Sequence, residues 1–292
     1  MARRKPPTRH GLVIVDKPSG MTSHDVVSVL RKQLGERRIG HAGTLDPDAT
    51  GVLLVGVGYV TRLLTFLSGL DKTYTAQIVL GSSTSTLDSS GAVTATHDMS
   101  NISIEDVQRV VKENFVGKIS QVPPMVSALK VDGVRLHELA RQGIEVERAA
   151  RELTIYSFNV FGMSESGIID VEIHCSSGTY IRSLADDLGR ALGGSAHLRN
   201  LRRISVGGFL QSECSNLEDP VVHPPITAVR TMSRVIADEQ MQTMIKHGRE
   251  LEKFDSPAPW VLVDEQNAVL AVYEMSPSGR AKPSVVMANA VA

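Results

Sequence analysis

The chain has few cysteines and no long apolar segment. Cys175 and Cys214 are the only cysteines among 292 residues, too few for a disulfide framework and without the spacing of a metal site. No run of about 18 apolar residues occurs, so we expect no membrane-spanning helix. The first ten residues are basic with no apolar core behind them, which predicts a short disordered tail and not a secretory signal. Together these absences favour a cytoplasmic protein.

The chain also lacks an excess of either charge, because 31 Lys and Arg face 32 Asp and Glu. A net charge of −1 argues against a protein that binds nucleic acid over its whole surface. The distribution is uneven, since residues 1–212 hold 24 basic and 21 acidic side chains and residues 213–292 hold 7 and 11. Basic clusters at 31–38 and 199–203 are either phosphate contacts or solvated helix ends and loops. Charge alone leaves both readings open.

Strand and helix patterns are interspersed without internal repeats or a regular βαβ alternation. Strands are predicted at residues 11–15, 52–57, 74–80, 153–160 and 168–175, and helices at 23–34, 103–115, 136–142 and from 181. This order predicts an α+β fold with a mixed, largely antiparallel sheet flanked by helices. Three prolines within residues 219–225 indicate a domain boundary. We therefore expect a disordered tail at 1–10, a large domain at 11–225 and a small β-rich domain at 226–292.

The most constrained segment is residues 40–51, Gly-His-Ala-Gly-Thr-Leu-Asp-Pro-Asp-Ala-Thr-Gly. Its three glycines permit backbone conformations that are closed to other residues, and Pro47 stiffens the turn after Asp46. The segment lies between a basic helix end and an apolar strand, so it is predicted to be a loop that holds a carboxylate above a sheet. A surface turn in which Asp46 or Asp48 only caps a backbone N–H is the commoner fate of an Asp-Pro pair. That alternative does not account for twelve residues of this kind.

The same twelve residues resemble the catalytic motif of the TruB family, the bacterial tRNA pseudouridine-55 synthases. Other segments resemble further family blocks in the expected order, namely residues 15–23, 72–74 with 88–91, 123–130, 178–184 and 198–203. Together they cover about residues 11–212. The end of the chain resembles the small PUA-like domain that many of these enzymes carry, although its net acidity departs from that of an RNA-gripping module.

The resemblance implies an isomerase that acts on uridine 55 in the T-loop of tRNAs. Such an enzyme breaks the C1′–N1 glycosidic bond, turns the uracil and rejoins it through C5. No redox step occurs and no group is gained, so neither an organic cofactor nor a metal is expected. The resemblance makes Asp46 the nucleophilic carboxylate and Arg182 the cation that keeps it ionised. Attack on C1′, addition to uracil C6 and a glycal route all stay open.

The target base has to leave the stacked T-loop and enter a pocket. The residues that the resemblance implies for the flipped base are Tyr74, Tyr180, Leu201 and His41. Tyr74 is similar to the residue that stacks on the uracil and moves a proton, and His41 to one that occupies the space the nucleotide leaves. Lys17 and Lys130 are assigned to RNA binding, with shaping of the loop as an equal alternative; the same alternatives hold for Asp16 and Asp88. The implied partner is the T-arm of tRNA, with no membrane, a monomeric state and no obligate protein partner.

Two other classes of protein deserve comparison. Residues 46–50 also spell Asp-x-Asp-x-Thr, the nucleophile motif of haloacid-dehalogenase-type phosphatases, with Asp186 and Asp187 as magnesium ligands. That motif should end an apolar strand of a parallel sheet, which residues 38–43 and the element order do not provide. A non-catalytic RNA-binding protein would not need Asp46 and Arg182 together. Guide-RNA-dependent relatives share part of the motif, but residues 123–130 and the compact length favour a stand-alone enzyme.

Overall fold

The structure is a computed structural model of the chain. It describes residues 6–287 except 128–129, 132, 137–138, 140–141, 145 and 166, and only the backbone of 130, 131 and 135. The first five residues of the expected tail, the Lys130 side chain and most of the helix expected at 136–142 lie outside this description. Within the rest of the expected tail, Thr8 N–H donates to the Glu36 carboxylate at 3.0 Å and the His10 ring contacts that of Tyr59 at 4.7 Å.

The helices are α1 (Ser23–Leu34), η1 (Gly58–Leu63), α2 (Leu64–Ser68), α3 (Ile104–Asn114), α5 (Ile181–Ala191), η2 (Gln211–Glu213), η3 (Pro225–Val229) and α6 (Glu239–Lys246). The strands are β1 (Gly11–Lys17), β2 (Ile39–Ala42), β3 (Thr50–Val57), β4 (Lys72–Leu80), β5 (Ser82–Thr84), β6 (Val93–Thr96), β7 (Gly117–Gln121), β8 (Lys130–Val131), β9 (Val134–Arg135), β10 (Arg151–Met163), β11 (Ile168–Cys175), β12 (Ala196–Val206), β13 (Phe209–Leu210), β14 (Val222–His223), β15 (Ser233–Ile236), β16 (Trp260–Val263), β17 (Val269–Met275) and β18 (Ala281–Val286). None of the helices in the described residues has the length and apolar character that a membrane crossing requires.

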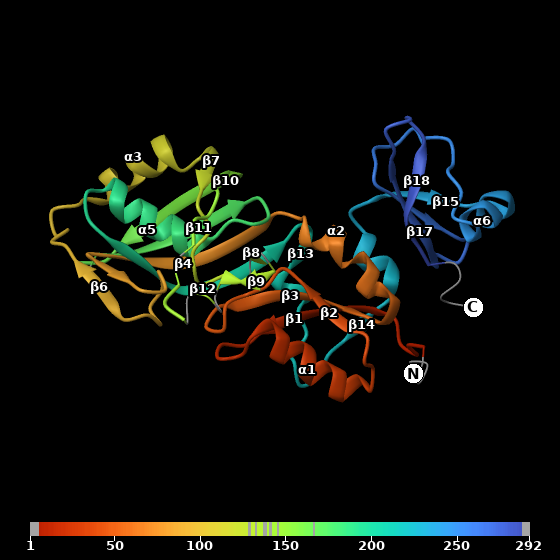
Figure 1. Cartoon of the computed structure of the whole chain (residues 1–292), viewed down its shortest axis with the longest axis horizontal. Coiled ribbons are helices and arrows are strands. Elements are labelled where there is room, and N and C mark those ends of the chain that lie inside the picture. Colours follow the sequence, from red (N-terminus) through yellow and green to blue (C-terminus); the bar gives the residue numbers. More distant parts are fainter. Residues whose placement is uncertain are drawn as a thin grey trace.

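In the described part of the chain, ten strands form one mixed sheet (Figure 1). Its order is β14-β1-β3-β12-β4-β11-β10-β7, with β2 beside β3 and β13 beside β12. β12 runs parallel to β3, and the other strand pairs of this sheet are antiparallel. Helices α3 and α5 pack on the β4–β11–β10 half, and α1 covers β1 and β3. The α+β class predicted from the sequence is therefore confirmed.

Helices α1 and α3 begin where their sequences predict. Thr22 and Asp25 form a capping box at the start of α1, and Ser103 and Asp106 form one at the start of α3. In each box the hydroxyl accepts the N3 backbone N–H while the carboxylate accepts the N-cap N–H, which satisfies two donors that a helix start leaves unpaired. Helix α1 ends at Gly35, whose φ of 63° lies in the left-handed region that favours glycine.

A smaller sheet of strands β15 to β18 follows the large one, with α6 packed against it (Figure 1). Because successive side chains of a strand point to opposite faces, β16 serves two cores. Trp260 and Leu262 pack with α6, whereas Val261 and Val263 belong to an apolar cluster that also contains Ile14 of β1. The two sheets therefore share a hydrophobic core. The proposed division after residue 225 stays a prediction.

The shared core predicts how truncation affects stability. Ala228 and Val229 of η3 are at most 1% exposed and belong to the same cluster. We expect a chain that ends at Met232 to unfold at lower urea concentration than the full chain, because it exposes apolar side chains of the large domain. A chain that ends at Pro224 should lose at least about 2 kcal/mol more, since it also removes both η3 residues from the core. Equal urea midpoints for the two truncated chains would contradict this account.

Candidate active site

The loop between β2 and β3 carries Asp46 and is held by the segment that follows β1. The Lys17 ammonium donates hydrogen bonds to the carbonyl oxygens of Pro18 at 2.8 Å, Met21 at 2.6 Å and Pro47 at 2.9 Å. The first two acceptors lie in the β1–α1 loop and the third follows Asp46 directly. One ammonium therefore fastens two loops to each other.

Lys17 is fully buried, and burial lowers its pKa to about 8 against the opposing attraction of the Asp48 carboxylate. An ammonium has three N–H donors, and protein carbonyls accept all three here. Of the two roles considered for Lys17, its contacts favour shaping the loop. An RNA phosphate would have to displace one of these carbonyls to reach it.

Two glycines of the motif are required by close packing against Arg203. The backbone of Gly51 has a φ of 104°, and a Cβ atom there would lie 2.1 Å from the Arg203 carbonyl oxygen. Gly43 has a φ of 76°, and a Cβ atom there would lie 3.3 Å from Arg203 Nη1. Only glycine combines these backbone conformations with such close contacts.

Arg182, the second residue of α5, holds the Asp46 carboxylate with two donors. Its Nε lies 2.9 Å from Asp46 Oδ2, and its Nη2 lies 3.2 Å from Oδ1. Nη1 and Nη2 also donate to the carbonyl oxygens of Thr86 and Val126, each at 2.9 Å. The Arg182 side chain is 5% exposed and that of Asp46 is 40% exposed. Backbone carbonyl groups therefore hold the Arg182 guanidinium in place, while the Asp46 carboxylate remains partly exposed.

A second carboxylate, Asp88, lies 3.6 Å from Arg182 Nε. Its Oδ1 accepts hydrogen bonds from Thr86 Oγ1 at 2.6 Å and from the Ser90 backbone at 3.1 Å, which fixes its position. Burial raises the pKa of Asp46; the Arg182 cation opposes this shift, and the Asp88 charge adds to it. The pKa of Asp46 therefore stays above the ordinary value of an Asp side chain, although the Arg182 guanidinium is in contact with it.

A cleft of about 320 Å³ opens beside Asp46. The residues expected at the site that line this cleft are Asp46, Tyr74, Tyr180, Arg182 and Leu201. They come from the motif loop, β4, the start of α5 and β12, so the cleft joins segments that are far apart in the sequence. Gln121 fixes the entry to α5, because its side-chain amide exchanges hydrogen bonds with the backbone N–H and carbonyl of Tyr180 at 2.9 and 3.1 Å.

Two expected residues, Lys17 and His41, are not among the described residues that line the cleft. Lys17 lies beneath the loop. The Lys130 side chain lies outside the described part of the chain. His41 is on β2, and its Nδ1 is buried with no hydrogen-bond partner among the described residues. Burial lowers the pKa of His41, and the charge of Arg203 lowers it further, so its imidazole favours the neutral form.

Two cleft residues, Lys72 and Arg203, were not among the predicted site residues. Arg203 is 1% exposed and donates to the carbonyl oxygens of Val52 at 2.7 Å and Gly43 at 2.8 Å. It also hydrogen-bonds Tyr74, whose pKa is raised by burial against the effect of this cation. Lys72 is 5% exposed and begins β4 two residues before Tyr74. Lys72 and Arg203 both lie in segments that resemble family blocks, 72–74 and 198–203, and Arg203 also belongs to an arginine cluster. These were the sequence signals that could have indicated them.

The arginine cluster at 199–203 lies on a strand and not on a helix end or loop. All three arginines are part of β12. Arg202 pairs with Asp16 at 2.7 Å, and Arg199 donates to the Gln77 side chain at 2.8 and 3.1 Å. The reading of this cluster as a solvated helix end or loop is therefore wrong. Contact with phosphates stays a prediction, since the Arg202 side chain is 31% exposed. The Asp16 carboxylate, for its part, is held by Arg202.

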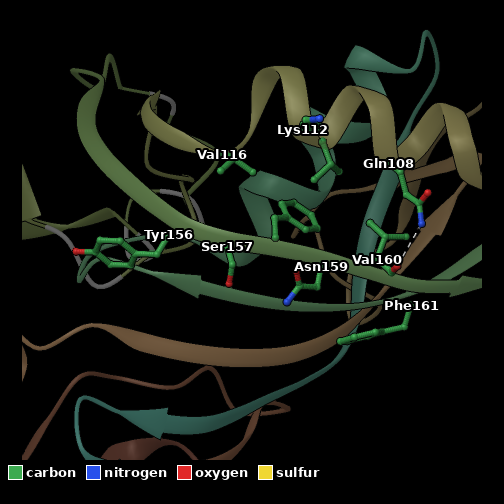
Figure 2. Close-up of a pocket in the computed structure, with 10 residues that line it drawn as sticks. Gln108, Lys112, Val116, Tyr156, Ser157, Asn159, Val160 and Phe161 are labelled. Carbon is green, nitrogen blue, oxygen red and sulfur yellow. Dashed lines mark hydrogen bonds between the residues drawn. The ribbon is translucent and has the colours of Figure 1, made fainter.

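A larger cavity of about 550 Å³ lies elsewhere, between α3 and the outer part of β10 (Figure 2). Val116 and Lys112 border it from α3 and the turn that follows, and Tyr156 and Phe161 border it from β10. None of the expected site residues reaches it. The cavity also contains no paired carboxylates or buried cations that would suggest chemistry.

The arrangement does not match a phosphatase. Asp186 and Asp187 both pair with Arg190 on their own helix. Among the described residues, no group of three or more His, Cys, Asp or Glu side chains is placed to hold a metal ion. The magnesium ligands that this alternative needs do not converge on Asp46.

Two family models match consecutive segments of the chain. Residues 31–181 match the N-terminal domain of the TruB family pseudouridylate synthases. The chain belongs to the TruB family. Residues 182–221 match a tRNA pseudouridylate synthase B C-terminal domain, a match that ends before β15 begins at Ser233. The family resemblance seen in the motifs is thus confirmed.

TruB-family relatives cover almost the whole chain. A protein named tRNA pseudouridine synthase B from Rhodococcus jostii is 43% identical and covers 98% of this chain and 97% of its own. A protein of the same name from Halalkalibacterium halodurans is 39% identical, with coverage of 96% and 98%. A chain in a crystal structure of a Cbf5-Nop10-Gar1 complex has a TM-score of 0.70 at 26% identity and covers 90% of this chain and 78% of its own. The chain is a pseudouridine synthase, an isomerase.

The clamp around the motif loop predicts the effect of replacing its lysine. Lys17→Met keeps the length of the side chain but leaves three carbonyl groups without their donor. We expect a loss of about 2–4 kcal/mol in the free energy of unfolding, since each unsatisfied buried group costs about 1–3 kcal/mol and water replaces part of the loss. Urea unfolding measures this. Lys32→Met, at an exposed position of α1, is the control and should change stability by less than about 0.5 kcal/mol; equal effects would show that the clamp contributes nothing.

Proposed function

We propose that this TruB-family enzyme converts uridine 55 in the T-loop of tRNAs to pseudouridine, with Asp46 as its nucleophile. The observation that carries the proposal is the Asp46 carboxylate, held by two Arg182 donors at the wall of a cleft of about 320 Å³. The choice of tRNA as substrate is supported by the relatives named tRNA pseudouridine synthase B, because they match this chain over nearly their full length.

The cleft suits a single flipped base. Its volume is at the lower end of ligand sites, which span about 300–1,000 Å³. Tyr74 is 8% exposed and offers a ring for stacking, while Tyr180 and Leu201 supply further apolar wall. We assign His41 to the space that the flipped nucleotide leaves, since a neutral imidazole stacks among bases without a charge penalty. Flipping costs a few kcal/mol, which contacts in the cleft repay.

The reaction needs Asp46 in its ionised form by each of the routes considered. A carboxylate is the attacking group in attack on C1′ and in addition to C6, and it is the base in a glycal route. Arg182 favours this form by charge and by two hydrogen bonds. Its other donors bind backbone carbonyls, so it keeps one orientation and aims the carboxylate at the cleft. Tyr74 lines the same cleft, and we assign it to stacking and proton movement.

The proposal also covers the oligomeric state, the protein partners and the location of the enzyme. The residues assigned to chemistry, Asp46, Tyr74 and Arg182, all come from this one chain. We therefore propose a monomer that acts without an obligate protein partner, in the cytoplasm where its tRNA substrate is found. Purified chain alone, incubated with an unmodified tRNA transcript, tests this directly. Pseudouridine mapped at position 55 supports the proposal, and modification at another position or none overturns it.

Replacement of the nucleophile should separate chemistry from binding. Asp46→Asn preserves size but removes the charge, so we expect turnover to fall at least about 10³-fold. Affinity for tRNA should change less than about threefold, because RNA binding depends on phosphate contacts and the shape of the folded T-loop. Single-turnover assays and filter binding measure the two effects. Residual activity within tenfold of wild type would remove Asp46 from the mechanism.

The pH dependence follows from the raised pKa of Asp46. The carboxylate takes up a proton as pH falls through this pKa, so activity should decline on the acidic side at a higher pH than an ordinary Asp would give. Asp88→Asn removes a neighbouring negative charge, which lowers the Asp46 pKa, and the acid limb should move to lower pH. Single-turnover rates on a T-arm stem-loop from about pH 4.5 to 8 would show the shift. Asp98→Asn, at an exposed position outside the cleft, is the control; an unmoved or upward-shifted limb for Asp88→Asn would contradict the assignment.

A further inference from the structure

The cleft contains two buried cations that no carboxylate neutralises. Lys72 and Arg203 are 5% and 1% exposed. In the part of the chain that the structure describes, neither forms an ion pair, whereas Arg182 contacts both Asp46 and Asp88. A buried charge without a partner is costly. Among the described residues that line the cleft, the cations Lys72, Arg182 and Arg203 face the one carboxylate of Asp46. Even when Asp88, which contacts Arg182, is counted with it, one positive charge is in excess, which favours an anionic ligand.

The sheet places both cations beside the surface assigned to the base. Lys72 and Tyr74 are two residues apart on β4, so their side chains lie on the same face. Arg203 of β12 is the register partner of Tyr74. A Cβ atom at Gly43, where the motif loop begins, would lie 3.7 Å from Lys72 Cε and 3.3 Å from Arg203 Nη1. All three polar side chains line the cleft.

Lys72 has a donor to spare, in contrast to the buried Lys17. Its ammonium donates to the carbonyl oxygens of Ser68, at 2.7 Å, and Leu70. An ammonium carries three N–H groups, and the described residues provide no third acceptor. Arg203 already donates to Val52, Gly43 and Tyr74. Lys72 is thus the cation that is available to a bound molecule.

The proposed reaction produces an anion in the cleft. When the C1′–N1 bond breaks, its electron pair leaves with the uracil, and the negative charge spreads over N1, O2 and O4. Rejoining through C5 uses an electron pair of this anion. C5 then loses its proton and N1 gains one, so the isomerisation adds and removes no atom. A fixed cation in a site shielded from water stabilises such charge more than water does.

We propose that the Lys72 ammonium, backed by Arg203, donates a hydrogen bond to the departing uracil and stabilises the negative charge that develops on it. This role rests on the proposed function, since it concerns the base released at Asp46. Lys72 gives up no proton in this step. Asp46 and Lys72 therefore have different roles: the carboxylate acts on the nucleoside, and the ammonium stabilises the negative charge of the leaving base.

The groups around Lys72 also predict how the reaction rate depends on pH. Burial, together with the charge of Arg203, lowers the pKa of Lys72 to about 8, and Cys175 and Asp71 oppose these effects. Among the described residues that line this cleft, Asp46, Tyr74 and Tyr180 are the other groups with a shifted pKa, and burial raises the pKa of each. Arg182 and Arg203 are the remaining charged groups there. As pH rises through about 8, Lys72 loses the charge that the reaction needs, so the wild-type rate should fall there.

Lys72→Met tests the proposal. We expect its single-turnover rate on a uridine-containing T-arm stem-loop to fall about 100-fold, the usual effect of removing one such donor, with binding little changed. Its melting temperature should also fall, because the Ser68 and Leu70 carbonyl groups lose their donor, so the rates are compared at a temperature at which both proteins are folded. A stem-loop with 5-fluorouridine at the target is the second substrate. Fluorine withdraws electrons and stabilises the departing base by itself, so the defect, measured as loss of 5-fluorouridine, should shrink about tenfold relative to uridine. Lys112→Met, at an exposed position of α3 outside the cleft, should match wild type on both substrates.

The outcomes separate this inference from the function on which it rests. Wild-type protein that makes no pseudouridine would overturn the proposed function, whatever the variants do. An active wild type with Lys72→Met within threefold of it, or with an equal defect on both substrates, would overturn only the role of Lys72. If Lys72→Met does not fold, Lys72→Arg decides the question, because a guanidinium stays charged and the decline near pH 8 should disappear. A decline that persists would contradict the proposal.

Discussion

The ion pair between Asp46 and Arg182 is the contact on which the site depends. It joins residues that are 136 positions apart in the chain. Arg182 is fixed by carbonyls of two further loops, and Asp46 by a loop that Lys17 fastens from below. Breaking a fully buried pair costs about 3–5 kcal/mol; the cost is smaller here because Asp46 is 40% exposed. That exposure is what allows the carboxylate to meet a substrate.

β12 is the element that makes this contact possible. It lies between β3, which follows the Asp46 loop, and β4, which carries Tyr74. Its Arg203 reaches across to the carbonyls of Gly43 and Val52 and to the Tyr74 hydroxyl. The two halves of the sheet are therefore joined by backbone hydrogen bonds and by one buried side chain, directly beneath the cleft.

Local patterns in the sequence were sufficient for much of the fold. The starts of α1 and α3 were predicted to within one residue, because the side chains that start a helix are neighbours in sequence. β1 and β3 are recognisable because both of their faces are buried, which requires continuous apolar runs. The motif pointed to Asp46 and its relation to Arg182. Each of these signals depends on residues close to one another or on a whole-motif resemblance.

The features that were missed depend on contacts between distant segments. β12 carries Arg199, Arg202 and Arg203, a pattern typical of an exposed loop, and only the sheet around it shows that each guanidinium has partners inside the protein. Lys17 and Lys72 are both lysines at strand ends. Whether such a lysine clamps a loop or faces a substrate depends on how many carbonyls lie within reach, and no local pattern reports that number.

Contacts between distant segments also determine what the net charge of the chain implies for RNA binding. A chain of net charge −1 is a poor general binder of RNA, and the arginines of β12 are engaged within the protein. The positive charge that matters is concentrated in a cleft lined, among the described residues, by the three cations Lys72, Arg182 and Arg203 and the carboxylate of Asp46. There it acts over a short distance and in a low dielectric, so a single unpaired ammonium has more effect than several exposed ones. Under the proposed function, binding of the tRNA depends on phosphate contacts and on the shape of its folded T-loop, and the proposed role of Lys72 uses the charge in the cleft on the base.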